Sequence, residues 1–302
     1  MSIPAAHAGV TFGLLEVVPL AVAAVLYAKR ASTLADRGRP VPPWRQASFA
    51  AGLAAIAVAL FSPIGHVSEE LVLIHMVEHL LIADVGALLL VLGLTGPLLQ
   101  PVLAVPALDR LRILAHPAVA FPLWAVNLYF WHIPALYEAA YGTAPVHALE
   151  HTAFIFFGCL MWMPLVGPLP VPAWFGNAWR LGYVIGVRFT GVILGNILMW
   201  SGTVLYPRYE AGQAYWGIRP LADQSTAGAI MMIEGTFVAL GVFAWLFFRT
   251  AREGTERQRL VELAEQRGVA LDEARAARAV AAGQGARLEE RLLAGGDERE
   301  RT

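Results

Sequence analysis

The sequence predicts an all-α polytopic membrane protein with about seven transmembrane helices. Hydrophobic residues make up 57 % of the 302-residue chain and charged residues only 15 %, whereas about a quarter of the residues in a soluble domain are charged. Apolar stretches long enough to cross a bilayer recur along the chain, and a helix satisfies every backbone hydrogen bond within such a stretch. The composition therefore excludes an ordinary soluble domain.

The first three predicted helices cover residues 9–28, 47–64 and 70–94. The basic, proline-rich segment "RGRPVPPW" separates the first two, and clusters of this kind favour loops. The third helix is apolar enough to span, yet it carries four side chains that ionise or hydrogen-bond strongly: His75, Glu78, His79 and Asp84. Such groups are costly in hydrocarbon and usually face a bundle interior where something binds them.

The other four predicted helices cover residues 117–137, 146–168, 182–205 and 223–248. The segment "GLTGPLLQP" precedes the first of these four, and "GPLPVPAWFG" separates the second from the third. Both segments are rich in glycine and proline, which suits loops better than continuous helices. The last predicted helix begins near "LADQSTAG" and leads into a charged tail.

Basic residues in the loops predict the orientation of the bundle. Cytoplasmic loops accumulate Lys and Arg. The first, third and fifth loops and the exit from the last helix are basic, and they hold Lys29, Arg30, Arg37, Arg39, Arg45, Arg110, Arg112, Arg180, Arg249 and Arg252. The other loops carry none, apart from Arg208 and Arg219 in the last. We therefore expect the N-terminus outside and the C-terminus in the cytoplasm.

The C-terminal segment differs in composition from the rest of the chain. Residues 252–302 hold ten Arg and eleven Asp or Glu, almost half of all Lys, Arg, Asp and Glu residues. A weak apolar stripe runs along this segment through Leu260, Leu263, Ala264 and Leu271, with no run of membrane length. The sequence thus predicts a transmembrane bundle at 1–250 and a charged cytoplasmic tail at 251–302 that is helical or partly disordered.

Several functional classes have little support. The formal net charge is −1, and no basic stripe with interleaved aromatic residues indicates a nucleic-acid partner. The lone Cys159 excludes an internal disulfide and a CxxC site. No nucleophile with an adjacent base, phosphate-binding glycine loop or redox motif is present, so we do not expect an enzyme.

Five histidines are predicted to lie at one level of the bundle. With the expected orientation, His75 and His79 lie in the external half of the third helix, and His147 and His151 lie in the first external turns of the fifth. His132 lies shortly before the outer end of the fourth helix. Residues four apart on a helix differ by about 40° around its axis, so each pair shares a face. The remaining histidines are assigned to interface or loop positions: His7, His66 and His116.

This pattern predicts a metal or cofactor site. Histidine is the commonest metal ligand near neutral pH, and two pairs with a third imidazole are able to converge on one ion. Glu78 and Glu150 precede the second histidine of each pair and are candidate oxygen ligands or acceptors that fix the imidazole tautomers. The order "HMVEH" and "HALEH" excludes an HExxH zinc-protease site. Structural hydrogen bonding by the histidines is the alternative.

The last helix offers further candidate ligands. Asp223 and Gln224 are expected at its external end, and Met231 and Met232 lie two turns deeper. Thioethers favour copper(I) over harder ions, although Met is also ordinary core filler. Elsewhere, Asp84 and Arg188 are predicted to form a buried charge pair that offsets the cost of two isolated charges.

The motifs together resemble the CtaG family of assembly factors for caa-type cytochrome c oxidases, which are multi-span bacterial membrane proteins. The matching motifs are "HMVEHLL", "HP" at 116–117, "FWHIPALYEAA", "HALEHTAFIFFG", "LYPRY" and "PLADQSTAGAIMM", in order over about residues 40–248. The residues that stand at the family's motif positions are His75, His79, His132, His147, His151, Asp223 and Gln224. The resemblance implies a protein of the bacterial cytoplasmic membrane that assembles cytochrome c oxidase, with a proposed role in copper delivery.

We therefore expect a non-enzymatic assembly factor that binds copper in the outer half of its bundle and delivers it to an oxidase subunit. One alternative is a haem-binding or haem-handling protein, because imidazoles on facing helices also supply axial ligands. Another is a metal- or proton-coupled transporter that uses the buried charges Glu78, Asp84, Arg188 and Glu234. Metal analysis and a visible spectrum of the purified protein distinguish copper from haem.

Overall fold

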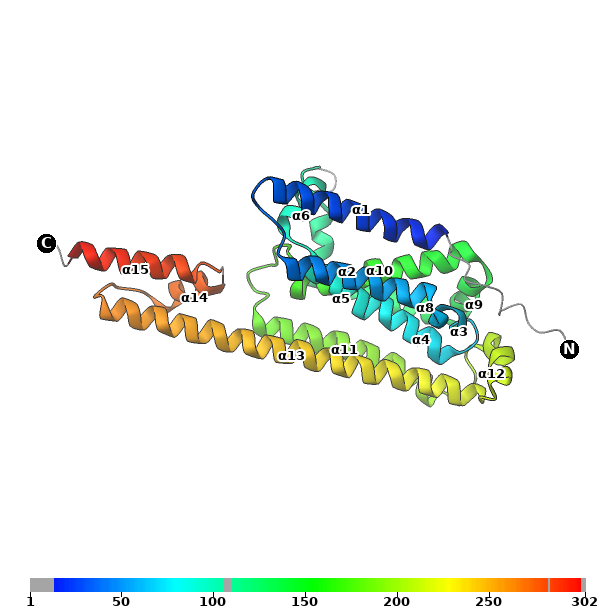
Figure 1. The fold of residues 1–302 in the computed structure, drawn as a ribbon. Coiled ribbons are helices and arrows are strands. Elements are labelled where there is room, and N and C mark those ends of the chain that lie inside the picture. Colours follow the sequence, from blue (N-terminus) through cyan, green and yellow to red (C-terminus); the bar gives the residue numbers. More distant parts are fainter. Residues whose placement is uncertain (1–13, 106–109, 282, 300–302) are drawn as a thin grey trace. The chain divides into compact units, whose positions relative to one another are not determined.

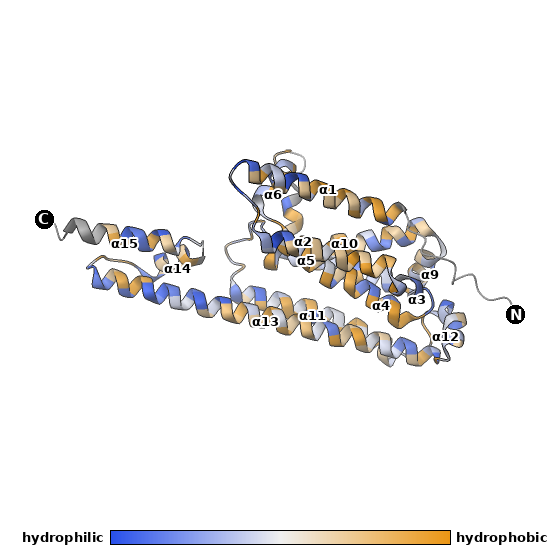
Figure 2. Cartoon of the chain, in the orientation of Figure 1, coloured by the Kyte–Doolittle hydropathy of each residue, from blue (hydrophilic) through white to orange (hydrophobic). Residues whose placement is uncertain are grey.

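The structure is a computed structural model that describes residues 14–105, 110–281 and 283–299, and these residues form helices and connecting loops with no strand. Figure 1 shows the fold, and Figure 2 shows that α1 and α4 are mostly hydrophobic whereas the C-terminal part of α13 is largely hydrophilic. The predicted all-α class is confirmed. The chain divides into two compact units, Met1–Phe237 and Val238–Thr302, which are described separately.

Unit 1 holds the helix bundle. Its helices, in chain order, are α1 (Leu14–Asp36), α2 (Pro43–Phe61), α3 (Pro63–Val67), α4 (Val72–Leu80), η2 (Leu81–Gly86), α5 (Ala87–Gly93), α6 (Gly96–Leu103), η3 (Arg110–Ala115), α8 (Pro117–His132), α9 (Pro134–Gly142), α10 (Ala144–Val166), α11 (Asn177–Trp200), η4 (Pro207–Tyr209), α12 (Glu210–Trp216) and the first part of α13 (Pro220–Gln266). The segment α4–η2–α5 is continuous, and η2 is a single π-helical stretch.

Among the described residues, six helices are long and apolar enough to cross a membrane, and α8 with α9 forms a seventh candidate that is bent by 75°. This agrees with the predicted number of about seven. Pro134 accounts for the bend, because the helical region is disfavoured for a residue before proline. Ile133 accordingly has φ −65° and ψ 123°.

Helix α1 continues past its predicted end at residue 28 to Asp36. Its basic side chains reach back to the bundle instead of ending the helix: Arg30 Nη2 donates to the Pro97 carbonyl oxygen at 2.9 Å. Tyr27 stacks on Phe49 of α2 with ring centroids 3.9 Å apart, and its hydroxyl donates to the Gly93 carbonyl oxygen at 3.0 Å. This end of α1 is therefore fixed by specific contacts.

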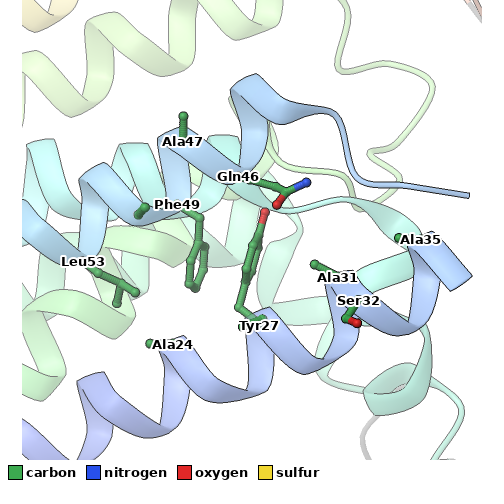
Figure 3. A pocket seen from close by; sticks show the side chains of 11 residues that line it. Ala24, Tyr27, Ala31, Ser32, Ala35, Gln46, Ala47, Phe49 and Leu53 are labelled. Atoms are coloured by element: carbon green, nitrogen blue, oxygen red, sulfur yellow. The ribbon is translucent and has the colours of Figure 1, made fainter.

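Small side chains line the space between α1 and α2. Figure 3 shows the pocket there, with Tyr27 and Phe49 side by side and alanines around them. Its volume is about 630 Å³. The Tyr27–Phe49 stack joins α1 to α2 beside this pocket, whereas the contacts near the two ends of α1 are with Pro97 of α6 and His151 of α10.

Close approach of α10 to the third span depends on Gly158. A Cβ at this position would meet the carbonyl oxygen of Ala83 in η2 and the Cβ of Ala87 in α5, the latter at 3.0 Å. Glycine permits this approach of two backbones, as small residues do at other helix interfaces in membranes. The contact sets the separation of α10 from the continuous α4–η2–α5 span.

We expect Gly158→Val to destabilise the bundle by about 1–3 kcal/mol or more, because the added methyl groups overpack a backbone contact that has no room to adjust. The measurement is the thermal unfolding midpoint of the detergent-purified protein. Gly182→Val is the matched control, because a Cβ at Gly182 of α11 meets nothing within 4 Å. Equal midpoints for the two variants would contradict the packing argument.

Unit 2 contains the remainder of α13, α14 (Glu273–Ala281) and α15 (Gly285–Arg299). The three segments share a small hydrophobic core made of Leu260, Ala264, Ala276, Val280 and Leu292. Gly268 and Gly283 adopt φ values of 64° and 67° at the turns, a region that favours glycine. Arg259 of α13 pairs with Glu289 of α15 at 2.5 Å. The charged C-terminal segment is thus helical where it is described.

Candidate metal centre between two helices

Two histidine pairs face each other across the interface of α4 and α10. His75 and His79 lie on α4 with ring centroids 4.2 Å apart, and His147 and His151 lie on α10 with the same spacing. Across the interface, the His75 and His147 rings are 6.2 Å apart and the His79 and His151 rings are 5.6 Å apart. The doubled HxxxH spacing therefore brings four imidazoles together inside one bundle.

Two glutamates of the same helices complete the cluster. Glu78 directs one oxygen to His75 Nδ1 and the other to His151 Nε2, each at 4.0 Å. Glu150 Oε1 lies 4.0 Å from His79 Nε2. These separations are too long for hydrogen bonds. They are close to the span of two ligands that each lie about 2.0–2.2 Å from a shared ion. Both carboxylates are 2 % exposed, so they belong to the interior of the cluster.

A third carboxylate comes from α1. Glu16 Oε1 lies 3.0 Å from His151 Nδ1, within hydrogen-bonding distance. Glu16 is not among the site residues predicted from the sequence, although an acidic residue within an apolar span is a usable signal. Three-residue groups with ligand atoms mutually within 4.8 Å are Glu16–His147–His151 and His75–His79–Glu150.

Many polar atoms of the cluster have no hydrogen-bond partner within the described part of the chain. They include both ring nitrogens of His75 and His79, Nε2 of His147 and His151, and Oε2 of Glu78. Buried polar atoms are nearly always paired, and leaving one unpaired costs about 1–3 kcal/mol. A bound group would satisfy these donors and acceptors, and imidazole with carboxylate is a donor set that fits a transition-metal ion.

His132 lies beside this cluster but outside both three-residue groups. Its Nδ1 is 2.7 Å from the Leu128 carbonyl oxygen and therefore acts as the donor, which leaves the lone pair on Nε2, a buried atom with no described partner. The ring contacts Phe154 at a centroid distance of 6.3 Å, and His79 contacts the same ring at 4.4 Å. Phe154 thus lies next to both imidazoles.

Tyrosines close one side of the cluster. His75 has three tyrosine rings within 6.3 Å between centroids, those of Tyr137, Tyr141 and Tyr209. The Tyr137 and Tyr209 hydroxyls are 2.8 Å apart, so one donates to the other. The "LYPRY" segment contributes Tyr209 and also Arg208, whose guanidinium lies 3.9 Å over the Tyr141 ring. This wall covers His75, which is buried, whereas His147 and Glu16 are partly exposed.

Asp223 holds the start of α4 in place. Its two carboxylate oxygens accept from the backbone N–H groups of Val72 (2.8 Å) and Leu73 (3.0 Å), and Oδ2 also accepts from Gln213 Nε2 at 2.8 Å. A carboxylate at a helix N-terminus satisfies donors that lack partners within the helix. Because its oxygens are engaged in this way, we assign Asp223 a positioning role for His75, three residues after Val72.

The other candidate ligands of α13 also have local partners. Gln224 accepts from Leu205 N–H at 2.8 Å and donates to the Leu198 and Thr203 carbonyl oxygens at 3.2 Å. Met232 packs beside Gly195 of α11, and Met231 is buried. None of these residues is in the two groups of convergent ligand atoms. They are therefore not included in the metal centre that we describe.

Asp84 and Arg188 are predicted from the sequence to form a buried ion pair, but no direct ion pair joins them among the described residues. The two groups interact electrostatically at longer range, and the Arg188 guanidinium hydrogen-bonds to other groups. Arg188 Nη2 donates to the Met232 carbonyl oxygen and to Thr236 Oγ1, the latter at 2.7 Å. The guanidinium reaches α13 because Gly235 leaves room beside it. Asp84 and Glu234 remain its electrostatic neighbours. Of the three histidines assigned elsewhere, His66 lies in the short helix α3, His116 is the N-cap residue of α8, and His7 lies outside the described residues.

Comparison with known proteins identifies the family. The chain is 25 % identical over 228 residues to the uncharacterized proteins Mb0105 of Mycobacterium bovis and MT0111 of Mycobacterium tuberculosis. Each match covers 69 % of this chain and 34 % of the relative, so the chain spans about a third of the length of these relatives. No solved structure matches it. The family described as cytochrome c oxidase caa3 assembly factor (Caa3_CtaG) matches residues 25–253, and the chain therefore belongs to this family.

Proposed function

We propose that the protein assists the assembly of cytochrome c oxidase by holding copper between α4 and α10 and passing it to an oxidase subunit. The observation that carries the proposal is the set of buried, unpaired imidazole nitrogens on two facing helices. Imidazole is a ligand that copper accepts, and the family supplies the connection to the oxidase. Within the cluster, the four paired histidines would supply the imidazole ligands.

The ligand chemistry supports transfer as well as binding. The cluster offers imidazoles and carboxylates without a thiolate cage, and a partly exposed histidine, His147, lies at its edge. An ion held by such ligands exchanges more readily than one enclosed by several cysteine thiolates, which bind copper(I) strongly. Delivery to a client protein requires this exchange. The role of the protein is therefore proposed to be carriage of the ion and not catalysis.

We further propose that the histidine cluster opens to the outside of the bacterial cytoplasmic membrane. Arg45 Nη1 donates to the Leu92 and Leu94 carbonyl oxygens at the far end of the span that begins with α4. The basic first loop and the α4 histidines thus belong to opposite ends of that span. Because basic loops favour the cytoplasmic side, the histidines are assigned to the external side, with the N-terminus also external.

The proposal is tested with the full-length protein purified in detergent and loaded with copper(I) under anaerobic, reducing conditions. We expect copper to remain bound after desalting, and the visible spectrum to lack a Soret band. A variant with His75, His79, His147 and His151 all changed to alanine should retain no copper above background. Equal retention by the wild type and this variant would refute the site, and a Soret band in the protein as isolated would favour haem.

A further inference from the structure

We infer that the bundle binds two metal ions, one held by the α4 histidines with Glu150 and the other by the α10 histidines with Glu16 of α1. This inference rests on the proposed function, because it assumes that the cluster binds metal. It adds a second position and a ligand, Glu16, that lies outside the 25–253 segment matched by the family. The second position is therefore not implied by membership of the family.

The geometry divides the donors into two groups. The first comprises His75, His79 and Glu150, and the second comprises Glu16, His147 and His151. Within each group the ligand atoms lie within 4.8 Å of one another. Three ligands that each lie about 2.0–2.2 Å from one ion are roughly 3.5–3.8 Å apart, so side-chain movements of up to about 1 Å would bring each group onto an ion. The two groups share no residue.

Glu78 connects the two positions. Its Oε2 faces His75 Nδ1, and its Oε1 faces His151 Nε2, both at 4.0 Å. A ligating histidine usually donates its other ring N–H to a carboxylate, which fixes the tautomer. At 4.0 Å neither contact is a hydrogen bond, and both separations would have to shorten for Glu78 to accept from one histidine of each group. In that arrangement His151 presents its Nδ1 lone pair beside the Glu16 carboxylate, and its proton resides on Nε2.

Metal binding displaces protons from its ligands, and when the three carboxylates are ionised, charge balance favours two cations over one. Glu16, Glu78 and Glu150 bring three carboxylates to one part of the bundle, and the ion pairs described for them are with imidazoles. Unbalanced charges are costly at membrane depth. One copper(I) ion offsets a single carboxylate, whereas two offset two of the three. A second cation therefore reduces the electrostatic cost that a single occupied position leaves.

The two positions differ in exposure. All members of the first group are buried, whereas Glu16 and His147 of the second group are partly exposed. An ion must pass the exposed position to reach the buried one if it enters at this edge. We therefore assign the Glu16 position as the entry and exit site and the Glu150 position as the more slowly exchanging site.

The inference is tested by copper titration of three full-length proteins in detergent: the wild type, Glu16→Gln and Glu69→Gln. Copper(I) is supplied under anaerobic, reducing conditions, and the copper-to-protein ratio is measured after desalting. We expect about two copper ions per chain for the wild type and about one for Glu16→Gln. Glu69→Gln is the matched control, because Glu69 is an exposed carboxylate in the loop before α4, and we expect it to retain two.

The outcomes separate this inference from the proposed function. A wild-type ratio of one would overturn the two-ion arrangement and leave copper binding intact, whereas a ratio of zero would overturn both. Two ions bound by Glu16→Gln would refute Glu16 as a ligand. The wild-type ratio does not depend on how a variant folds, and the elution profile in size-exclusion chromatography shows whether Glu16→Gln retains the native bundle.

Discussion

Replacing His79 with alanine is expected to remove nearly all oxidase assembly activity and to weaken copper binding at the buried position by more than about 100-fold. The imidazole lies 4.0 Å from Glu150 and packs against His75 with ring centroids 4.2 Å apart. Loss of a residue that only orients a metal ligand already lowers affinity by 10–100-fold, and His79 is proposed to bind the ion itself. Its removal therefore leaves the buried position without one of its three ligands.

The measurements are the copper content of the purified variant and the cytochrome c oxidase activity of membranes from cells that produce it. We expect normal abundance in the membrane, because His79 has two ring nitrogens without a described partner and its removal breaks no hydrogen bond. His66→Ala is the matched control, since His66 lies in the short helix α3 outside the cluster. Full copper content and full oxidase activity of His79→Ala would contradict the ligand assignment.

Local sequence patterns predicted the helices and the histidine pairs. A transmembrane helix requires only an apolar stretch of sufficient length, so the spans follow from hydropathy without knowledge of their neighbours. The HxxxH spacing likewise determines that His75 and His79 share a face of α4, because helical geometry is local. The bend between α8 and α9 follows from Pro134 in the same way. These features depend on residues that are near one another in the sequence.

Contacts between distant helices were not predictable in the same way. Glu16 meets His151 across 135 positions of the sequence, and no local pattern indicates which helix lies beside α10. The same limit explains Arg188, which was expected to pair with Asp84 and instead bonds to Thr236. Its partner depends on the packing of α11 against α13 and on the room beside Gly235. Pairings of this kind are decided by tertiary structure.

Asp223→Ala is expected to lower the free energy of unfolding by at least about 3 kcal/mol and to weaken copper binding. The change removes the acceptor for the Val72 and Leu73 N–H groups and for the Gln213 side chain. Each buried donor left without a partner costs about 1–3 kcal/mol. The first turn of α4 then loses its anchor to α13, and His75 lies one turn further along the helix.

The unfolding midpoint in detergent and the copper affinity of the folded protein measure these two effects. Asp223→Asn should lie between the wild type and Asp223→Ala in stability, because an amide keeps one acceptor oxygen while its NH₂ group faces a donor.

Ser225→Ala is the matched control on α13, since the exposed Ser225 hydroxyl bonds only within its own helix, to the Leu221 carbonyl oxygen. If Asp223→Ala and Ser225→Ala unfold at the same temperature, the anchor does not stabilise the bundle. If Asp223→Ala is destabilised but binds copper with wild-type affinity, Asp223 stabilises the fold without positioning His75.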